Sequence, residues 1–148
     1  MVVEECKNIE ELRPLAELWL KEITADDYGL DVDLNVIGED LKKWIAGEGA
    51  ILVAKQSDVP IGLIAVFAVP SYLGKQKITL EKYWYAKKDG RMAGPKLYVE
   101  AINWAHSHGC SHLITSGSKM ASDRHDSICR FLEKTGAKHF ETSYIYKL

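Results

Sequence analysis

The stretch 89–110, DGRMAGPKLYVEAINWAHSHGC, decides the fold. Apolar residues recur at helical spacing over 97–105, and Gly109 supplies a left-handed stop after them. Gly94 is suited to cap this helix and Pro95 to its first position, where the N–H that proline lacks would be unpaired anyway. The spacing predicts a glycine-rich, basic turn that leads directly into an amphipathic helix.

This turn has two interpretations. The first N–H groups of a helix have no partner within it, and together with the helix dipole they favour an anion such as a pyrophosphate. Gly90 and Gly94 allow a close backbone approach, and Arg91 and Lys96 bring positive charge, with Lys87 and Lys88 just upstream. A plain strand-to-helix connection, with glycines for the turn and basic side chains in solvent, explains the same residues.

Outward from the turn, the hydrophobic pattern predicts strands and helices in mixed order, which indicates a sheet covered by helices. The predicted strands are 1–6, two runs within 50–69 around the turn-forming QSDVP, then 77–86, 111–116 and a closing strand or hairpin arm over 137–148. The predicted helices, besides the one after the turn, start near Arg13 or Pro14, span 36–46, and run from a cap at Ser122 or Asp123 to Gly136.

Composition restricts the class of protein. A length of 148 residues suits one compact domain over 1–148, and a net charge of -2 lacks the basic excess of a nucleic-acid binder. The longest apolar stretch, 59–70, is too short for a membrane span, and the N-terminus has no signal-peptide pattern. The three cysteines have no tight spacing, so we expect a reduced, cytoplasmic setting with no membrane or nucleic-acid partner.

A family resemblance follows from these segments. The strand EKYWYAKK (81–88), the turn, and LYVEAINWAHSHGCSHL (97–113) resemble motif A of the GNAT superfamily of acetyl-CoA-dependent N-acetyltransferases. The segment RHDSICRFLEKTGAKHFETSYIYKL (124–148) resembles motif B and the closing strands of that family. The chain is most similar in character to small acetyltransferase-like proteins of bacteriophages. The resemblance implies an α/β fold with a mixed, mostly antiparallel sheet flanked by helices, its strands splayed at the cofactor site.

The chain departs from the family pattern in both motifs. The family loop reads Gln/Arg-x-x-Gly-x-Gly/Ala, and Arg91-x-x-Gly94 matches its first half, but Lys96 replaces the last small residue. The other register ends correctly at Gly94, yet it begins with Asp89 and has Met92 at the middle glycine. In motif B, Leu132 stands where the family often has a tyrosine as general acid, and His125 stands where an asparagine is common.

The resemblance implies acetyl-CoA as co-substrate and direct attack of a primary amine on the thioester. Glu81 is the candidate general base, although a carboxylate that points to solvent beside Lys82 explains it equally. Tyr144 is a candidate acid, with Tyr146, Ser116 and Ser118 as other choices. The implied cofactor-binding residues are Tyr83, Trp84 and Tyr85 through their backbone, Arg91, Met92, Ala93, Gly94, Pro95 and Lys96 around the pyrophosphate, and His125.

Three other patterns carry less weight. The acidic segment 22–40 would attract a cationic amine to Asp26, Asp27, Asp31 and Asp33, but such a run is more often a solvated face. The stretch HSHGCSH (106–112) straddles a helix end and a turn, so its side chains should diverge and no metal site is predicted. Cys129 falls in a helix without a predicted base beside it, so no nucleophilic role is predicted.

Three functions remain open at this point. The first is an N-acetyltransferase with an amine acceptor, acting as a monomer or homodimer. The second is a catalytically weak or inactive CoA-fold protein that acts as a binding or regulatory partner, which the altered loop and the missing tyrosine favour. The third is an enzyme of the same fold with another acyl donor. The identity of the amine is not written in the sequence.

Overall fold

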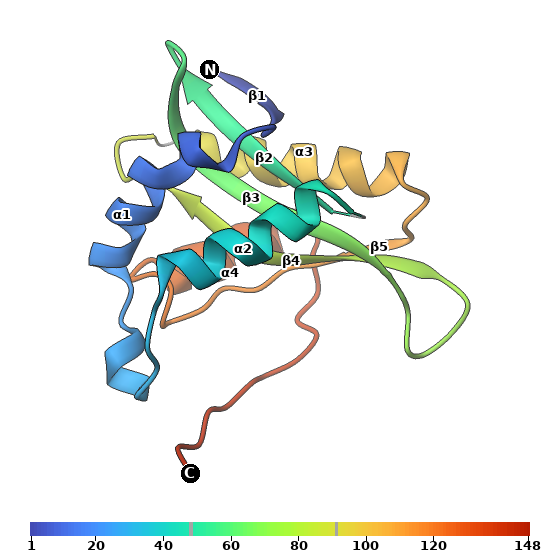
Figure 1. The fold of residues 1–148 in the computed structure, drawn as a ribbon. Coiled ribbons are helices and arrows are strands. Elements are labelled where there is room, and N and C mark those ends of the chain that lie inside the picture. Colours follow the sequence, from blue (N-terminus) through green and yellow to red (C-terminus); the bar gives the residue numbers. More distant parts are fainter. Residues whose placement is uncertain (48, 91) are drawn as a thin grey trace. The chain divides into compact units, whose positions relative to one another are not determined.

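Five strands form one mixed sheet in the computed structural model, which describes residues 1–47, 49–90 and 92–148 (Figure 1). The strands lie in chain order, β1-β2-β3-β4-β5, and only the β4–β5 pairing is parallel. The elements are β1 (Val2–Glu5), the 3-10 helix η1 (Ile9–Leu12), α1 (Arg13–Glu22), the 3-10 helix η2 (Ala25–Tyr28), α2 (Leu34–Ile45), β2 (Gly49–Gln56), β3 (Val59–Pro70), β4 (Lys77–Ala86), α3 (Ala93–Ser107), β5 (His112–Ile114) and α4 (His125–Lys134). The predicted α/β class with a mostly antiparallel sheet and flanking helices is confirmed.

Helix α3 covers one face of the sheet (Figure 1). Leu97 and Ala101 of α3 are fully buried, and they share a core with Leu52 of β2 and Ile64 of β3. This contact depends on Gly62 of β3, because a Cβ there would lie 3.1 Å from the Leu97 side chain and 2.9 Å from the Tyr85 carbonyl oxygen. The sequence therefore fixes how closely α3 approaches the sheet.

Helix α2 lies on the opposite face. The Trp44 ring of α2 is 4.7 Å from that of Phe67 on β3 and 6.1 Å from that of Tyr83 on β4, measured between centroids. Ile51 and Val53, which alternate with the α3-facing residues of β2, are fully buried. Burial on both faces explains why β2 and β3 read as nearly continuous apolar runs.

Two local irregularities shape the strands. Ser57 and Asp58 both have positive φ (49° and 62°), which gives the tight two-residue connection that joins β2 to β3. In the β3–β4 ladder, Ala65 is opposite Tyr83 and Val66 is opposite Glu81, so Lys82 is an extra residue. A bulge of this kind bends a strand and redirects its side chains.

Two predicted helix starts are wrong. Helix α3 begins at Ala93 with Met92 as its N-cap, because the Ala93 N–H bonds to the Gly90 carbonyl (2.8 Å) and closes a turn before Gly94. Pro95 fits at the third position for the reason that suits it to the first, since an N–H there has no helical acceptor either. Helix α4 has Arg124 as its N-cap rather than Ser122 or Asp123.

The predicted closing strand is also wrong. The structure assigns neither helix nor strand to residues 137–148, although Phe140, Tyr144 and Tyr146 have the two-residue spacing of one strand face. These three side chains are 58%, 93% and 86% exposed. Alternation is only half of what a strand requires, because its backbone needs a ladder partner as well.

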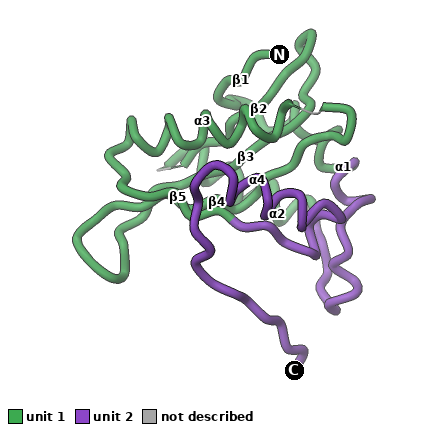
Figure 2. Tube along the Cα trace, turned by 180° about the vertical axis from the view of Figure 1, so that it is seen from behind, with its two compact units in different colours: residues 1–17, 34–115 green, residues 18–33, 116–148 purple. Residues whose placement is uncertain are grey.

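The chain divides into two compact units (Figure 2). Unit 1 comprises Met1–Glu17 and Leu34–Thr115 and contains the sheet, and unit 2 comprises Leu18–Asp33 and Ser116–Leu148. In unit 2, the Thr24 N–H donates to the Met120 carbonyl at 2.9 Å. A single functional domain over 1–148 stays a prediction. None of the helices formed by the described residues has both the length and the apolar character that a bilayer crossing needs.

Candidate functional site

The turn between β4 and α3 is built from backbone hydrogen bonds. The Lys87 N–H donates to the Ile61 carbonyl (2.9 Å), and the Gly90 N–H donates to the Lys87 carbonyl (3.0 Å). The Ala93 N–H is bonded to Gly90, and the Lys96 N–H donates to the Met92 carbonyl at 3.2 Å. Two amides of the first helical turn are thus in use within the protein. The sequence had predicted more unpaired donors here than the structure provides.

Gly94 leaves space at the start of α3. A Cβ on Gly94 would lie 3.9 Å from its nearest neighbour, the Trp84 ring, which is ordinary contact. The protein itself therefore does not require glycine here. Met92, the N-cap of α3, is 60% exposed, and the Lys96 ammonium lies 3.4 Å from the Met1 carbonyl oxygen. Arg91, on which the sequence interpretation placed most weight, lies outside the described residues.

The aromatic residues at the end of β4 pack on both faces of the sheet. The Trp84 ring stacks on that of Tyr98 of α3 with centroids 5.7 Å apart. Tyr83 faces α2, and burial raises the pKa of its phenol, an effect that the Lys82 ammonium opposes and the Asp40 carboxylate reinforces. The side chains of Tyr83 and Trp84 are thus engaged in packing, and contact of this backbone segment with a cofactor stays a prediction.

Glu81 has a hydrogen-bond donor that the sequence did not reveal. Its side chain is half-buried, and the Thr115 hydroxyl donates to Glu81 Oε2 at 3.1 Å. Thr115 directly follows β5, whose parallel ladder with β4 ends at the pair Leu80 and Ile114. The carboxylate is therefore held where the two parallel strands stop pairing. It is not the solvent-directed side chain of the alternative interpretation.

A hollow of about 520 Å³ lies between α2 and β4, lined by Asn35, Val36, Ile37, Glu39, Asp40, Lys43, Lys82 and Tyr83. Lys82 Nζ is 2.5 Å from Asp40 Oδ2 and 4.9 Å from the centroid of the Trp44 ring. The Lys82 ammonium is thus held by the Asp40 carboxylate and lies over an aromatic face. The four aspartates of the segment considered for amine binding, Asp26, Asp27, Asp31 and Asp33, are exposed.

In unit 2, helix α4 carries the positions that correspond to motif B. Leu132 is 9% exposed, so an apolar side chain fills the place of the tyrosine. His125 and Cys129 are one turn apart, with Cys129 Sγ 3.9 Å from Nδ1 and 3.8 Å from Nε2. The prediction that Cys129 lacks a neighbouring base is wrong. The spacing of four residues on a helix was the signal that could have found this pair.

The exposed histidines of the stretch 106–112 make only local contacts among those described. The His108 ring stacks on Trp104 with centroids 3.9 Å apart, and the His112 ring lies 2.8 Å from the Ser111 hydroxyl. Among the described residues, no group of three or more His, Cys, Asp or Glu side chains is arranged to hold a metal ion.

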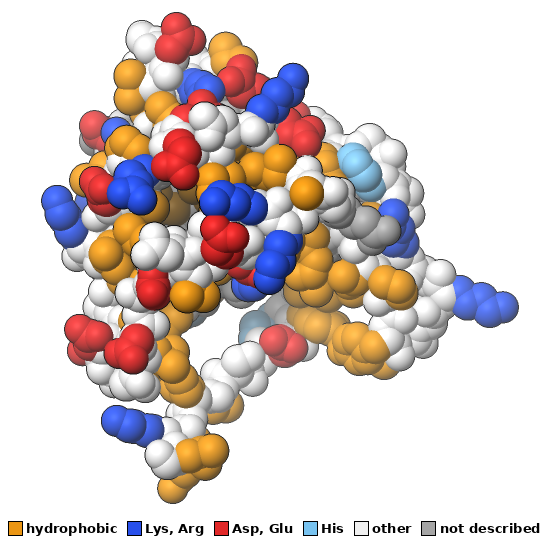
Figure 3. Space-filling model, in the orientation of Figure 1, with side chains coloured by type: hydrophobic (Ala, Val, Ile, Leu, Met, Phe, Trp, Pro, Cys, Tyr) orange, Lys and Arg blue, Asp and Glu red, His pale blue; other side chains and the backbone are white. Residues whose placement is uncertain are grey.

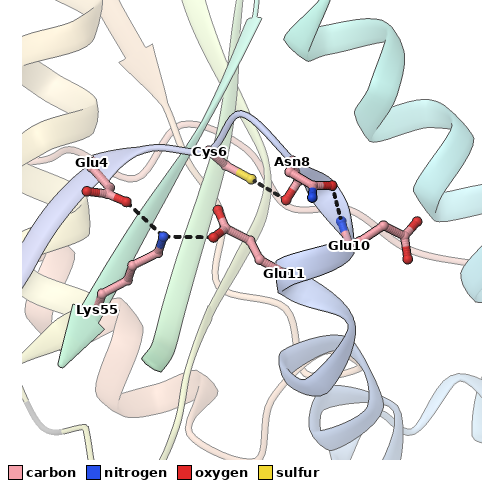
Figure 4. Close-up of polar contacts among 6 residues, drawn as sticks. All are labelled: Glu4, Cys6, Asn8, Glu10, Glu11 and Lys55. Atoms are coloured by element: carbon pink, nitrogen blue, oxygen red, sulfur yellow. Dashed lines mark hydrogen bonds and ion pairs between the residues drawn. The ribbon is translucent and has the colours of Figure 1, made fainter. Parts of the chain in front are cut away.

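Charges on the surface are mixed, and one polar cluster is structural. On the face drawn in Figure 3, acidic and basic side chains are interspersed without a large patch of one sign. Figure 4 shows Lys55 of β2 between two carboxylates, with Nζ 2.7 Å from both Glu4 Oε1 and Glu11 Oε2. The Cys6 thiol beside them donates to the Asn8 carbonyl at 3.2 Å. This cluster ties β1 and η1 to β2.

Comparison with solved structures identifies the fold. The structure of ribosomal-protein-alanine N-acetyltransferase from Brucella melitensis biovar Abortus 2308 matches with a TM-score of 0.75 at 13% identity, covering 100% of both chains. A probable acetyltransferase matches with a TM-score of 0.72 at 20% identity, covering 100% of this chain and 97% of the other. A GNAT family acetyltransferase from Staphylococcus aureus subsp. aureus USA300_TCH1516 matches with a TM-score of 0.64 at 16% identity, covering 99% of this chain and 98% of the other. The chain has the GNAT fold.

Comparison of sequences does not add a family to this identification of the fold. No family model matches the chain, and no curated protein matches it.

The predicted site residues divide between the two units. Unit 1 contains Glu81 and the strand end 83–85, both on β4, and the described part of the turn 90–96, which leads into α3. Unit 2 holds His125 and Tyr144, and the Tyr144 phenol is 93% exposed and therefore not held by packing. Thr115 and the His125–Cys129 pair are additions from the structure.

Proposed function

We propose that this protein is an N-acetyltransferase that moves an acetyl group from acetyl-CoA to a primary amine by direct attack. The observation that carries the proposal is the β4–turn–α3 unit, with Glu81 held by Thr115 at 3.1 Å, within a chain whose whole length has the GNAT fold. Several neighbours with this fold are acetyltransferases, including a ribosomal-protein-alanine N-acetyltransferase and an aminoglycoside acetyltransferase, and one is named a transcriptional regulator. The reaction type is transferred here from them as a proposal.

The residues of the turn fit an acyl-CoA. Gly94 has room for a close approach, and Arg91, Lys88 and Lys96 supply positive charge for a diphosphate. The backbone of 83–85 is the proposed partner of the pantetheine arm. Bound acetyl-CoA supplies the activated acetyl group as a thioester. The protein's part is to position the donor and the amine, which is the main source of rate in a direct transfer.

Glu81 is the proposed general base. An alkylammonium has a pKa of roughly 10.4, so the amine must lose a proton before it attacks. A half-buried carboxylate fixed by Thr115 can accept that proton directly or through a water molecule. Leu132 stands in place of the tyrosine that often acts as general acid, so the leaving thiolate has no proton donor at that position. A thiolate leaves readily even without a donor, because a thiol has a pKa of roughly 8.5. Tyr144 is the remaining candidate acid.

Calorimetric titration with acetyl-CoA tests the binding site. We expect the wild type to bind, and Arg91→Glu to bind at least about tenfold more weakly, because charge-assisted hydrogen bonds to the diphosphate are lost. Lys75→Glu changes the net charge equally in the β3–β4 connection, at the far end of β4, and serves as the matched control. Gly94→Ala should also weaken binding, since its Cβ would occupy the approach to the turn. If the wild type does not bind acetyl-CoA, the proposed acetyltransferase function is contradicted and only the GNAT fold stands.

Turnover with a panel of primary amines tests the base. We expect Glu81→Gln to lower kcat by roughly 10²-fold with unchanged acetyl-CoA affinity. Glu100→Gln, on the exposed face of α3, is the control. Binding of acetyl-CoA with no turnover of any amine would instead favour the second candidate, a CoA-fold binding protein, which the buried Leu132 supports.

A further inference from the structure

The hollow between α2 and β4 is not used by the proposed reaction. It lies within unit 1, on the face of the sheet that α2 covers (Figure 1). Its volume of about 520 Å³ is within the roughly 300–1,000 Å³ of pockets that hold ligands. Three of the side chains that line it, those of Val36, Asp40 and Lys43, have the spacing of one face of a helix. The lining thus includes a stripe along α2, which faces Lys82 and Tyr83 of β4.

Both carboxylates that line this hollow already have a lysine partner. The Asp40 carboxylate is paired with the Lys82 ammonium, which also lies over the Trp44 ring. The Glu39 carboxylate is 2.8 Å from the Lys42 ammonium, and this contact is the main reason why the pKa of Glu39 is lowered. A cationic ligand would have to compete with these lysines for either carboxylate. The hollow therefore does not favour a cation.

Lys43 differs from the other lysine of the lining. In the part of the chain that the structure describes, its ammonium makes neither an ion pair nor a hydrogen bond, and its side chain is exposed. Its attraction for Glu39 is the smallest of the effects on the pKa of that carboxyl. Lys43 can therefore bind an anion without giving up a contact. At the other end of the stripe, the apolar side chain of Val36 is 66% exposed.

The separation of Lys43 from Val36 indicates the length of the ligand. Seven residues of a helix correspond to about 10 Å along its axis. In an extended peptide, side chains two residues apart lie on the same face at a distance of about 7 Å. The Lys43 side chain is long and exposed, so its ammonium can reach over the remaining distance. A short extended peptide can thus contact both ends of the stripe at once.

We propose that this hollow binds an extended acidic peptide segment, with a carboxylate on Lys43 and an apolar side chain, two residues away, against Val36 and Tyr83. Charge complementarity identifies this occupant, because the carboxylates of the lining are paired while Lys43 has no partner among the described residues. The inference goes beyond the proposed function and does not depend on it, since neither acetyl-CoA nor Glu81 takes part in the binding.

Peptide titration of the full chain, followed by heteronuclear NMR, tests the proposal. The probe is acetyl-Ala-Leu-Ser-Glu-Ala-amide, which is blocked at both ends, so that glutamate is its only charge and it has no amine to acetylate. The comparison peptide has glutamine in place of the glutamate. We expect the amide shifts to change at 35–43 and 82–83. At low salt the glutamate peptide should bind about fivefold more tightly, the upper end of what one exposed ion pair contributes.

Single substitutions separate the two ends of the stripe. Lys43→Gln should bind both peptides equally. Lys75→Gln, in the β3–β4 connection outside the hollow, loses the same charge and should keep the preference for the glutamate peptide. Val36→Ser should weaken the binding of both peptides alike, because the apolar contact does not depend on charge. All three positions are exposed, and spectra recorded without peptide show whether each variant is folded.

Several results would overturn the peptide site. These are equal affinity of the wild type for the two peptides, no binding of either, shift changes elsewhere in the chain, or a preference that persists in Lys43→Gln. Sodium acetate is a further arm of the test, and if it shifts the same amides as strongly as the peptide does, the site is an adventitious carboxylate contact only. Acetyl-CoA is absent throughout, so failure here leaves the acetyltransferase proposal standing, and failure of acetyl-CoA to bind leaves the peptide site standing.

Discussion

At the residue scale, two polar side chains of β4, Thr79 and Glu81, differ in their hydrogen bonding. Glu81 accepts a hydrogen bond from Thr115 at 3.1 Å. Thr79 is fully buried, and its hydroxyl has no hydrogen-bond partner among the residues that the structure describes. A buried hydroxyl without a partner lowers stability, because it has lost its hydrogen bonds to water. Thr79 therefore marks a position where stability can be gained.

We predict that Thr79→Val raises the free energy of unfolding by about 1 kcal/mol, since it removes the unpaired hydroxyl while nearly keeping the shape of the side chain. Urea denaturation measures the change. Thr115→Val is the matched control, because it removes a hydroxyl that does have a partner, and it should give no gain. A loss of stability in Thr79→Val would mean that the hydroxyl is satisfied by a group such as a buried water molecule.

At the scale of elements, single contacts fix how neighbouring segments meet. The approach of α3 to the sheet depends on Gly62, and the junction of β1, η1 and β2 depends on the ion pairs of Lys55. The Lys55 side chain is 17% exposed, whereas most surface ion pairs are freely solvated and contribute little. Both contacts join segments that are distant in the sequence. Each depends on one residue, so one substitution can test it.

We predict that Gly62→Ala destabilises the protein by about 1–3 kcal/mol, the usual cost of overpacking a core. The added Cβ would lie 2.9 Å from a backbone carbonyl oxygen, which cannot move without disturbing the β3–β4 ladder. Gly94→Ala, where the nearest atom is 3.9 Å away, should leave stability unchanged or slightly higher. Equal melting temperatures for the two variants would contradict the close packing of α3.

The Lys55 cluster should make stability depend on pH in the acid range. The hydrogen bond from Lys55 holds the pKa of Glu11 below its ordinary value. In the unfolded chain a glutamate has a pKa of about 4.3, so the unfolded state binds more protons as the pH falls. The stabilisation is therefore complete well above that pH and is lost as the pH falls through the pKa of the folded state.

We predict that the stability difference between wild type and Glu11→Gln is largest near neutral pH and shrinks toward about pH 3. Thermal unfolding at several pH values measures it. Glu10→Gln is the control, because Glu10 is 67% exposed and 3.9 Å from its partner Arg13. A pH-independent difference would show that the carboxylate of Glu11 is not charged in the native cluster.

At the scale of the whole molecule, the two units differ in what orders them. Unit 1 has a sheet with α3 on one face and α2 on the other, and unit 2 has α4, η2 and long irregular segments. In unit 2, residues 138–148 have exposed side chains throughout. Stability in a protein is distributed according to burial and hydrogen bonding, so the units should open with different free energies.

Amide hydrogen exchange should therefore be slower in unit 1 than in unit 2. We predict that amides of β2, β3 and α3 exchange slowest and that those of 138–148 exchange at nearly the rate of an unstructured peptide. Mass spectrometry of exchanged peptides measures both in one sample. Strong protection over 138–148 would mean that this segment pairs with a strand after all, as its sequence pattern had suggested.

The sequence predicted the elements that local signals define. The apolar runs around Ser57 and Asp58 and the stops at Gly109 and Gly136 have local causes, and the structure confirms them, with positive φ at all four residues. The closing strand failed because an alternating pattern does not reveal whether a partner strand exists. Thr115 was missed because its role arises from the parallel pairing of β4 with β5, which joins positions distant in the chain.

The order of the strands in the sheet has a consequence for synthesis of the protein. Since β2, β3 and β4 are consecutive in both chain and sheet, their ladders need nothing beyond Ala86 and little loop-closure entropy. The antiparallel meander can thus form co-translationally, while later residues are still inside the ribosomal exit tunnel. The edge strands β1 and β5 pair across intervening helices, so they should join the nascent core last.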